Sequence, residues 1–190
     1  VFGNRFNKPL INSLHNCTSL THIVFGNDFN QPLGNALNNC TAISHIKFGT
    51  YFSQHLDDFL NVHPSLVHLG LGYNFNQKVS MPFNVRSLSL NSNNGNYGDN
   101  LPNTIEELEL GVNFNLKLDN LPSSIKKIIF GKNSKYNKEL NCLPDKLSIL
   151  QLPTYYDKKI SSIPSALFKV ICSANYKFIE DFTAICVETY

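Results

Sequence analysis

The stretch Ile-Glu-Glu-Leu-Glu-Leu-Gly-Val-Asn-Phe-Asn, residues 105–115, decides how this chain folds. Its first, fourth and sixth residues are apolar, and the last part of this frame alternates between apolar and polar side chains. Alternation with period two is typical of a short strand whose apolar side chains all point to one side. A polar residue, Asn113, and an aromatic residue, Phe114, follow the frame. The stretch therefore predicts a short strand followed by a turn.

The same apolar-x-x-apolar-x-apolar frame occurs eight times in the 190 residues, at spacings of 19 to 23 residues. All of its apolar positions are occupied by apolar residues, and its copies begin at Leu20, Ile43, Leu66, Val85, Ile105, Ile125, Leu147 and Leu167. Such self-similarity indicates a solenoid in which neighbouring turns stack on one another. We therefore predict a β-rich, leucine-rich-repeat-like right-handed solenoid. It has one short parallel strand per 19–23-residue turn and few or no long helices.

A polar slot recurs three residues after each frame. It is occupied by Asp28, Asn74, Asn93, Asn113, Asn133 and Asn175, with Tyr51 and Tyr155 as exceptions. An asparagine side chain can donate and accept hydrogen bonds at once, so it can bond the turns on either side. We predict an asparagine ladder at this slot. The ladder accounts for part of an unusual composition, since the chain has 26 Asn and only 24 Leu.

An aromatic residue follows the polar slot in each turn and is usually followed by another asparagine. The column consists of Phe6, Phe29, Phe52, Phe75, Tyr97, Phe114, Tyr136, Tyr156 and Tyr176. Aromatic rings stacked from turn to turn predict a continuous hydrophobic spine. For the return half of each turn we expect extended or short 3₁₀ segments because proline interrupts helices there. One helical turn is expected at 12–16, 35–39 and 59–63.

The repeat pattern also predicts the domain organisation. A solenoid of about eight turns covers residues 1–176, and residues 177–190 form a C-terminal cap, either a short helix or a strand. The chain begins on Val1 without an initiator methionine, so we expect a truncated N-terminus. An insertion at 91–96 is the expected place for a bulge.

Several phrases recur along the repeat: Phe-Asn-Lys-Pro-Leu (6–10), Phe-Asn-Gln-Pro-Leu (29–33), Leu-Gly-Val-Asn-Phe-Asn (110–115) and Leu-Pro-Ser-Ser-Ile (121–125). They resemble FNIP repeats, a leucine-rich-repeat-like family abundant in social amoebae and in giant viruses that infect amoebae. The resemblance implies an interaction module. Members often carry an F-box upstream, which implies the substrate-recognition part of a ubiquitin-ligase receptor. The present chain contains no recognisable F-box, and its first three units replace Leu-Pro with Asn-Cys-Thr or Val-His-Pro.

Composition excludes several other classes of protein. The net charge is +2 and neither half has a basic surplus, so we expect no nucleic acid as partner. No stretch approaches the ~18 consecutive apolar residues of a membrane helix, so we expect no membrane partner. The five cysteines are odd in number and lack CxxC spacing, which favours reduced thiols over disulfides or zinc. We expect a cytoplasmic monomer without cofactor, in the host cytoplasm if the protein is viral.

Function is then expected on the outward side of the strands, beside the second apolar residue of each frame. We predict a non-enzymatic protein-binding module, the alternative being a structural or adhesive solenoid with no specific partner. The predicted partner-binding face consists of His22, His45, Lys47, His68, Ser87, Ser89, Glu107, Glu109, Lys127 and Lys169.

The three histidines of this face invite a metal hypothesis, because zinc accepts imidazole nitrogen. We instead attribute them to duplication of one turn, since no Asp, Glu or Cys lies nearby in the ladder to complete a site. We therefore predict neither metal nor catalytic residues.

Two other sets of residues have a chemical and a structural interpretation. Glu107 and Glu109 could act as paired carboxylates, but a cross-strand ion pair from Glu107 to Lys127 is the preferred interpretation. Cys17 and Cys40 occupy equivalent places in neighbouring turns, where buried small-residue stacking is preferred over catalysis.

Overall fold

A computed structural model describes residues 1–82, 84–92 and 101–190. The chain forms two compact units, Val1–Ser92 and Asn93–Tyr190, and each is described by itself. The predictions for Asn93 and Tyr97, and most of the insertion at 91–96, lie outside the described residues. In the described part of the chain, no helix has the length and apolar character needed to cross a membrane.

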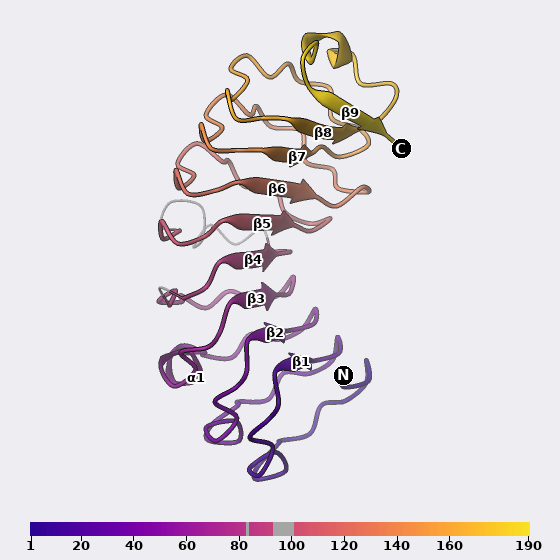
Figure 1. The fold of residues 1–190 in the computed structure, drawn as a ribbon. Coiled ribbons are helices and arrows are strands. Elements are labelled where there is room, and N and C mark those ends of the chain that lie inside the picture. Colours follow the sequence, from indigo (N-terminus) through magenta and orange to yellow (C-terminus); the bar gives the residue numbers. More distant parts are fainter. Residues whose placement is uncertain (83, 93–100) are drawn as a thin grey trace. The chain divides into compact units, whose positions relative to one another are not determined.

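The first unit is a ladder of four short parallel strands, one from each turn (Figure 1). They are β1 (His22–Val24), β2 (His45–Lys47), β3 (His68–Leu71) and β4 (Ser87–Leu90). Equivalent residues pair directly, so that His22 faces His45 and His45 faces His68. The helix α1 (Asp57–Asn61) lies between β2 and β3 and buries Phe59 and Leu60. Of the three helical turns predicted in the return segments, only this one is an α-helix.

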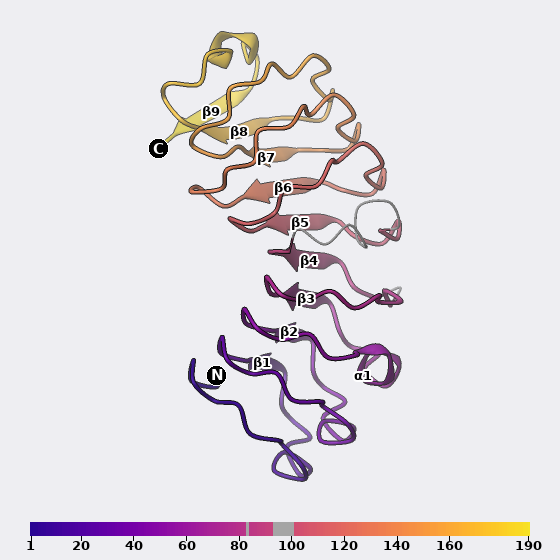
Figure 2. The same ribbon diagram turned by 180° about the vertical axis from the view of Figure 1, so that it is seen from behind.

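The second unit repeats the arrangement with five parallel strands. They are β5 (Glu107–Leu110), β6 (Lys127–Phe130), β7 (Ile149–Gln151), β8 (Lys169–Cys172) and β9 (Cys186–Thr189). Figure 2, the view from behind, shows the irregular return segments of the turns. The sequence predicts either a short helix or a strand for the segment 177–190. This segment contains both, the 3₁₀ helix η2 (Ile179–Asp181) and the strand β9. The predicted parallel-strand solenoid with almost no helix is thus confirmed.

The core lies directly under the strands. Every apolar frame position except Leu20 is buried, because the strands alternate and all turns present the same side inward. The aromatic column runs beside the frame. In the first unit the ring centroids of Phe29 and Phe52 lie 6.0 Å apart, and those of Phe52 and Phe75 also lie 6.0 Å apart. The predicted aromatic spine is therefore present in this unit.

The second unit continues the aromatic column mainly with tyrosine. Phe114 stacks on Tyr136 with ring centroids 6.1 Å apart, and Tyr156 lies 6.0 Å from Tyr176. The hydroxyls of Tyr136 and Tyr156 are buried and have no hydrogen-bond partner among the described residues. Burial raises the pKa of both hydroxyls, so they stay neutral. Tyr176 differs, because its hydroxyl donates to the carbonyl oxygen of Lys158 at 2.8 Å.

Replacing Tyr136 or Tyr156 with phenylalanine is expected to raise the free energy of unfolding by about 1 kcal/mol each, because a buried hydroxyl without a partner destabilises the fold. Urea unfolding measures the change. The matched control is Tyr176→Phe, which removes a hydrogen bond and should lower stability by about 1 kcal/mol. A loss of stability in all three variants would contradict the assignment of unsatisfied hydroxyls.

Each return segment enters its strand through the same turn, whatever residue occupies its first position. In every turn, the first frame residue donates its N–H to the carbonyl oxygen three residues earlier. The accepting residues are Cys17, Cys40, His63, Pro82, Pro102, Pro122, Pro144 and Pro164. A carbonyl oxygen is available in any residue, including proline, so this turn tolerates Cys, His or Pro. The first three repeats have Asn-Cys-Thr or Val-His-Pro in place of Leu-Pro. This replacement therefore leaves the hydrogen-bonded turn before the strand unchanged.

The asparagine ladder was predicted at the wrong slot. Asp28 is half-buried at this slot, and the side chains of Asn74, Asn113, Asn133 and Asn175 are exposed there. The backbone makes the contact between turns instead: the N–H of Asp28 donates to Asn4, that of Tyr51 to Asn27 and that of Asn74 to Thr50, each at 2.9 Å. Since the backbone amide supplies the bond, any side chain fits the slot. The exception Tyr51 follows from this.

An asparagine ladder does form two residues later, at the residue that follows several of the aromatics. Oδ1 of Asn7 accepts the backbone N–H of Asn30 at 2.9 Å, and Oδ1 of Asn30 accepts that of Ser53 at 3.0 Å. In the second unit, Oδ1 of Asn137 accepts the N–H of Asp157 at 3.1 Å. The asparagine side chain thus accepts a backbone N–H of the next turn, in a segment where no strand pairing supplies an acceptor. This slot explains part of the asparagine surplus.

Asn30→Ala is expected to lower the free energy of unfolding by about 1–2 kcal/mol. The variant leaves the half-buried N–H of Ser53 without its acceptor and also removes the bond from Nε2 of Gln54 at 2.9 Å. Asn115→Ala is the control, because the Asn115 side chain is exposed and makes no hydrogen bond with the described residues. Equal losses in the two variants, measured by urea unfolding, would show that the ladder bonds add no stability.

Candidate binding face

The outward side of β1–β4 carries the histidines of the predicted face. His22 is exposed, whereas His45 and His68 are half-buried. Lys47 is exposed on β2, and the neighbouring Gly70 on β3 has no Cβ, which makes room for the Lys47 stem. Ser87 of β4 is half-buried.

Ser89, which the sequence placed on the same face, is only 9% exposed. It therefore presents little surface to a partner.

The histidines form a stack rather than a converging site. The ring centroids of His22 and His45 lie 4.1 Å apart with planes 11° from parallel, and those of His45 and His68 lie 5.7 Å apart. Face-to-face rings direct their nitrogens side by side, whereas a tetrahedral ion needs ligands that converge. Among the described residues, no group of three or more His, Cys, Asp or Glu is placed to hold a metal ion.

A hydroxyl holds one nitrogen of each stacked ring. Nδ1 of His22 lies 3.0 Å from Thr21 Oγ1, Nδ1 of His45 lies 2.9 Å from Ser44 Oγ, and Nδ1 of His68 lies 2.9 Å from Ser87 Oγ. Burial lowers the pKa of His45, and the neighbouring His22 lowers it further. At neutral pH the central ring of the stack is therefore uncharged.

The outward side of the second unit carries charges that pair with one another. Nζ of Lys127 on β6 lies 3.7 Å from Oε2 of Glu107 on β5, which confirms the predicted cross-strand ion pair. Nζ of Lys169 on β8 lies 2.7 Å from Oε1 of Glu188 on β9. Glu109 is exposed. These ion pairs are solvent-accessible, so each is worth only a few tenths of a kcal/mol.

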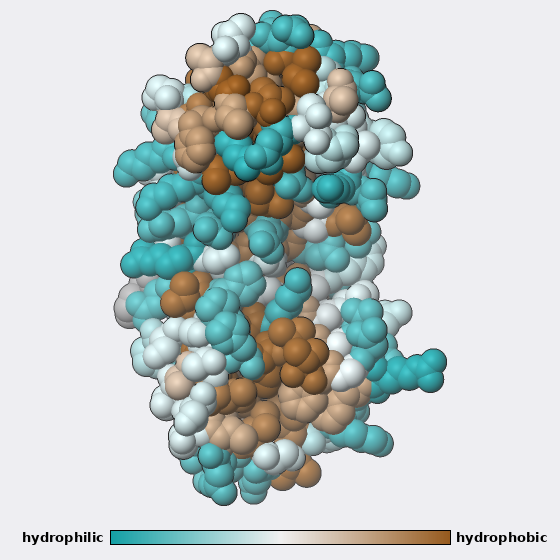
Figure 3. Space-filling model, turned by 45° about the vertical axis from the view of Figure 1, so that its right-hand side comes forward, coloured by the Kyte–Doolittle hydropathy of each residue, from teal (hydrophilic) through white to brown (hydrophobic). Residues whose placement is uncertain are grey.

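Apolar side chains lie between the charges of the second unit. Ile129, Ile149 and Ile171 are half-buried on the outward side of β6, β7 and β8. Figure 3, in which the right-hand side of Figure 1 comes forward, shows brown apolar surface among teal polar side chains. Partial exposure of apolar groups beside charged ones is typical of surfaces that bind proteins.

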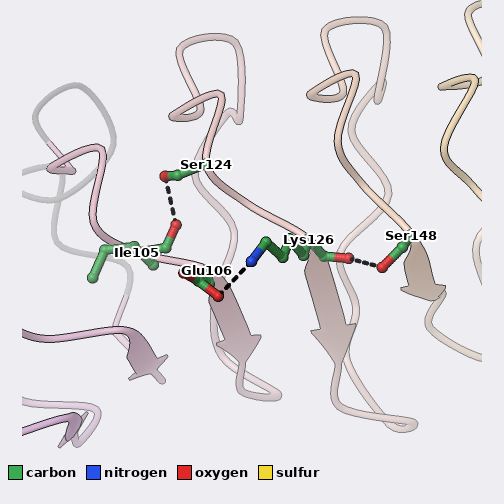
Figure 4. Close-up of polar contacts among 5 residues, drawn as sticks. All are labelled: Ile105, Glu106, Ser124, Lys126 and Ser148. Carbon is green, nitrogen blue, oxygen red and sulfur yellow. Dashed lines mark hydrogen bonds and ion pairs between the residues drawn. The ribbon is translucent and has the colours of Figure 1, made fainter.

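A further outward column, which the sequence analysis missed, precedes each strand. Nζ of Lys126 lies 2.8 Å from Oε2 of Glu106, while the hydroxyls of Ser124 and Ser148 donate to the carbonyl oxygens of Ile105 and Lys126 (Figure 4). The sequence does indicate this ion pair, because Glu106 and Lys126 occupy the same frame position in neighbouring turns. Glu106, Lys126 and Ser148 of this column extend the polar surface of the second unit, whereas the exposed Phe168 occupies the same position before β8.

Cys17 and Cys40 belong to a column whose third member, His63, the sequence analysis did not single out. Cys40 is fully buried and its thiol donates to the carbonyl oxygen of Leu14 at 3.3 Å. Burial raises the pKa of the Cys40 thiol, which keeps it protonated and unreactive. Nε2 of His63 lies 3.0 Å from the carbonyl oxygen of Leu37, and Nδ1 lies 2.7 Å from that of Phe59. The column thus bonds one turn to the previous one.

Comparison with known families and structures agrees with this geometry. The FNIP Repeat family model matches residues 98–133, which confirms the resemblance over that part of the chain. No curated protein matches the chain.

Among solved structures, the chain is similar to the one titled "The crystal structure of CroV588 a novel circular LRR protein structure". The two chains share 29% sequence identity with a TM-score of 0.68, and the match covers 92% of the present chain. It covers 26% of CroV588, so the present chain spans about a quarter of that protein's length. The leucine-rich-repeat-like fold is therefore established.

Proposed function

We propose that this FNIP-repeat solenoid is a non-catalytic protein-interaction module whose outward strand residues bind the partner. One observation carries the proposal. The inward frame positions are apolar in every turn, whereas the outward positions change from His and Lys on β1–β3 to Glu, Lys and Ile on β5–β8. Because packing of the core does not require particular residues at the outward positions, those residues can match the surface of a partner. Repeat solenoids commonly use extended surfaces of this kind for binding.

The finer proposal is that the chain forms the substrate-recognition part of an F-box-type ubiquitin-ligase receptor. Its support is the FNIP resemblance, since members of that family often carry an F-box upstream. We also propose a cytoplasmic location, in the host cytoplasm if the protein is viral, with a monomeric chain. The five cysteines are all unbridged, in keeping with reduced thiols. The sequence encoded upstream of Val1 tests the ligase proposal directly, because an F-box there supports it and a signal peptide contradicts it.

Charge reversal on the face tests the binding proposal. Lys47→Glu in the first unit and Glu109→Lys in the second should together abolish capture of a partner by the immobilised chain. Neither should unfold the chain, because both side chains are exposed. The matched controls are Lys78→Glu and Asp119→Lys, which reverse exposed charges of the same two signs away from the strands.

The outcomes discriminate between the two functional classes. A partner that is lost with the strand variants and retained with the controls supports the binding face. A partner indifferent to both strand variants would overturn it. A chain that captures nothing under any condition would favour the structural or adhesive alternative.

A further inference from the structure

Four apolar side chains of the second unit lie together on the outward side of β6–β8. This isoleucine patch consists of Ile129, Ile149 and Ile171, which are half-buried on neighbouring strands, and of Phe168, which is 57% exposed directly before β8. The backbone N–H of Phe168 donates to the carbonyl oxygen of Ser148, the residue before Ile149, at 3.1 Å. Single exposed apolar residues are ordinary, whereas a group of them on adjacent strands marks a contact surface.

The two lysines beside Ile149 are held away from it. Lys127 and Lys169 are the ladder neighbours of Ile149, one on each side. Nζ of Lys127 lies 3.7 Å from Oε2 of Glu107 on β5, and Nζ of Lys169 lies 2.7 Å from Oε1 of Glu188 on β9. Each ammonium group is therefore paired on the side that faces away from β7, which leaves Ile149 accessible between them.

Polar groups at the border of the patch are engaged within the chain as well. Nε2 of Gln151 donates to the carbonyl oxygen of Phe130 at 2.8 Å. The hydroxyl of Ser148 donates to the carbonyl oxygen of Lys126 at 2.8 Å, and Nζ of Lys126 pairs with Oε2 of Glu106 at 2.8 Å. Because these charges and hydrogen bonds are already compensated, the patch offers apolar contact to a partner.

The backbone of these strands leaves a partner only the side chains to contact. β7 pairs with β6 along one edge and with β8 along the other, and β8 also pairs with β9. A partner strand can join a sheet only at an unpaired edge. The partner of the isoleucine patch must therefore lie across the face of the strands.

The size of the patch indicates how much of a partner it holds. A phenylalanine side chain buries about 150–250 Å² when it is fully covered, so Phe168 at 57% exposure provides roughly 100 Å². The half-buried isoleucines provide less each. A stable homodimer buries about 800 Å² on each partner, with a larger apolar share than this patch supplies. The patch therefore suits one short segment of a partner better than a second copy of this chain.

The spacing of the isoleucines matches one face of an α-helix. Ile129 and Ile171 occupy equivalent positions two strands apart, which corresponds to about 10 Å, and Ile149 lies on the strand between them. In an α-helix, residues i and i+7 lie about 10.5 Å apart along the axis, with i+3 or i+4 between them on the same face. An extended segment repeats its side chains every ~6.7 Å on one face, which does not fit this spacing.

We propose that the isoleucine patch binds an amphipathic α-helix of a protein partner through apolar residues at i, i+3 or i+4, and i+7. The inference rests on the proposed function, since it names the chemistry of the partner for the second unit's part of the same face. Apolar contact carries the affinity because the bordering charges are paired within the chain. Ionic strength therefore has little effect on binding.

The test uses the whole chain and a fluorescein-labelled peptide of about 15 residues, with leucine at i, i+4 and i+7 and with alanine and glutamine elsewhere. Fluorescence anisotropy measures the dissociation constant in about 0.05 M and about 0.5 M sodium chloride. This constant should lie below about 1 mM and change less than about twofold between the two salt concentrations. A peptide of the same composition with its leucines at alternate positions should bind at least about fivefold more weakly.

Variants of the chain locate the contact. Phe168→Ser should weaken binding about tenfold, and Ile149→Thr about threefold, in proportion to the apolar area removed. The matched control is Val67→Ser, because Val67 occupies the same frame position in the first unit and is 39% exposed. It should leave the affinity unchanged. Urea unfolding shows that each variant is folded, and Phe168→Ser remains informative if Ile149→Thr is not, since Phe168 is exposed.

Several results would overturn the inference. They are a dissociation constant above about 1 mM, a tenfold loss of affinity in the higher salt, equal binding of the two peptides, or full affinity in Phe168→Ser. Self-association of the chain in sedimentation velocity, abolished by Phe168→Ser, would assign the patch to a second copy and overturn it too.

These failures are distinguishable from failure of the proposed function. A captured partner that is lost with Lys47→Glu and Glu109→Lys but retained with Phe168→Ser keeps the binding face and removes only the helix-binding patch. A partner indifferent to all three changes removes both.

Discussion

Phe52→Ala is expected to lower the free energy of unfolding by about 3–5 kcal/mol, which is a large part of the stability of an ordinary domain. Phe52 is fully buried and lies in the middle of the aromatic column of the first unit. Its ring contacts Phe29 and Phe75, with centroids 6.0 Å away on each side, and Phe48 at 3.9 Å. Because the turns stack, truncation removes contacts with the turn before and the turn after, and neighbouring backbones cannot collapse into the cavity.

The control is the aromatic residue directly before it in sequence. Tyr51 is 52% exposed, and its side chain extends from the edge of the same turn. Tyr51→Ala should therefore change stability by less than about 0.5 kcal/mol. Urea unfolding followed by circular dichroism measures both variants. Similar losses from Phe52→Ala and Tyr51→Ala would contradict the central role of the aromatic column.

Gly49→Ala is expected to destabilise the first unit by about 2–3 kcal/mol, although it adds only one methyl group. A Cβ at this position would lie 2.6 Å from the Cα of Asn27 and closer still to the carbonyl oxygen of Gly26. These are backbone atoms of the previous turn, which cannot rotate away. The two turns would have to separate, and the hydrogen bonds of the β1–β2 ladder beside them would weaken.

Gly131→Ala provides the matched control in the second unit. The nearest atom to its added Cβ is Cγ1 of Val112, at 3.2 Å, and a side chain on an exposed residue can move. The expected loss is less than about 1 kcal/mol. Thermal or urea unfolding of the two variants gives the comparison. If Gly131→Ala proved as damaging as Gly49→Ala, close backbone approach would not be the reason for glycine at position 49.

The prediction for the asparagines shows where sequence reasoning reached its limit. The slot after the strand resembled a ladder position because its asparagines recur at regular spacing. In the structure Asn74 and Asn133 are exposed there, and the side chains that bond the turns belong to Asn7, Asn30 and Asn137. Both slots recur with the same period. Periodicity shows that positions are equivalent from turn to turn, but it does not show which side chain faces a neighbouring backbone.

The candidate face was predictable in part. The pair Glu107–Lys127 followed from the frame, because parallel strands in register place equivalent residues side by side. The burial of Ser89 and the contacts of His63 did not follow, since they depend on how closely neighbouring turns approach each other. The stacking of His22 on His45 at 4.1 Å likewise required the spacing between strands.

The sequence by itself determined the parallel strands, their register and the apolar and aromatic columns of the core. The physical reason is that burial of apolar side chains repeats with the chain, so a regular pattern of apolar residues has one good solution. The tertiary structure alone decided which polar groups meet between turns, and it added the ion pair of Lys169 with Glu188, which the frame did not indicate. Hydrogen bonds and ion pairs depend on distances of a few ångströms between atoms of different turns, and the order of residues does not specify those distances. Through them the second unit acquires a face on which lysines pair with carboxylates of neighbouring strands.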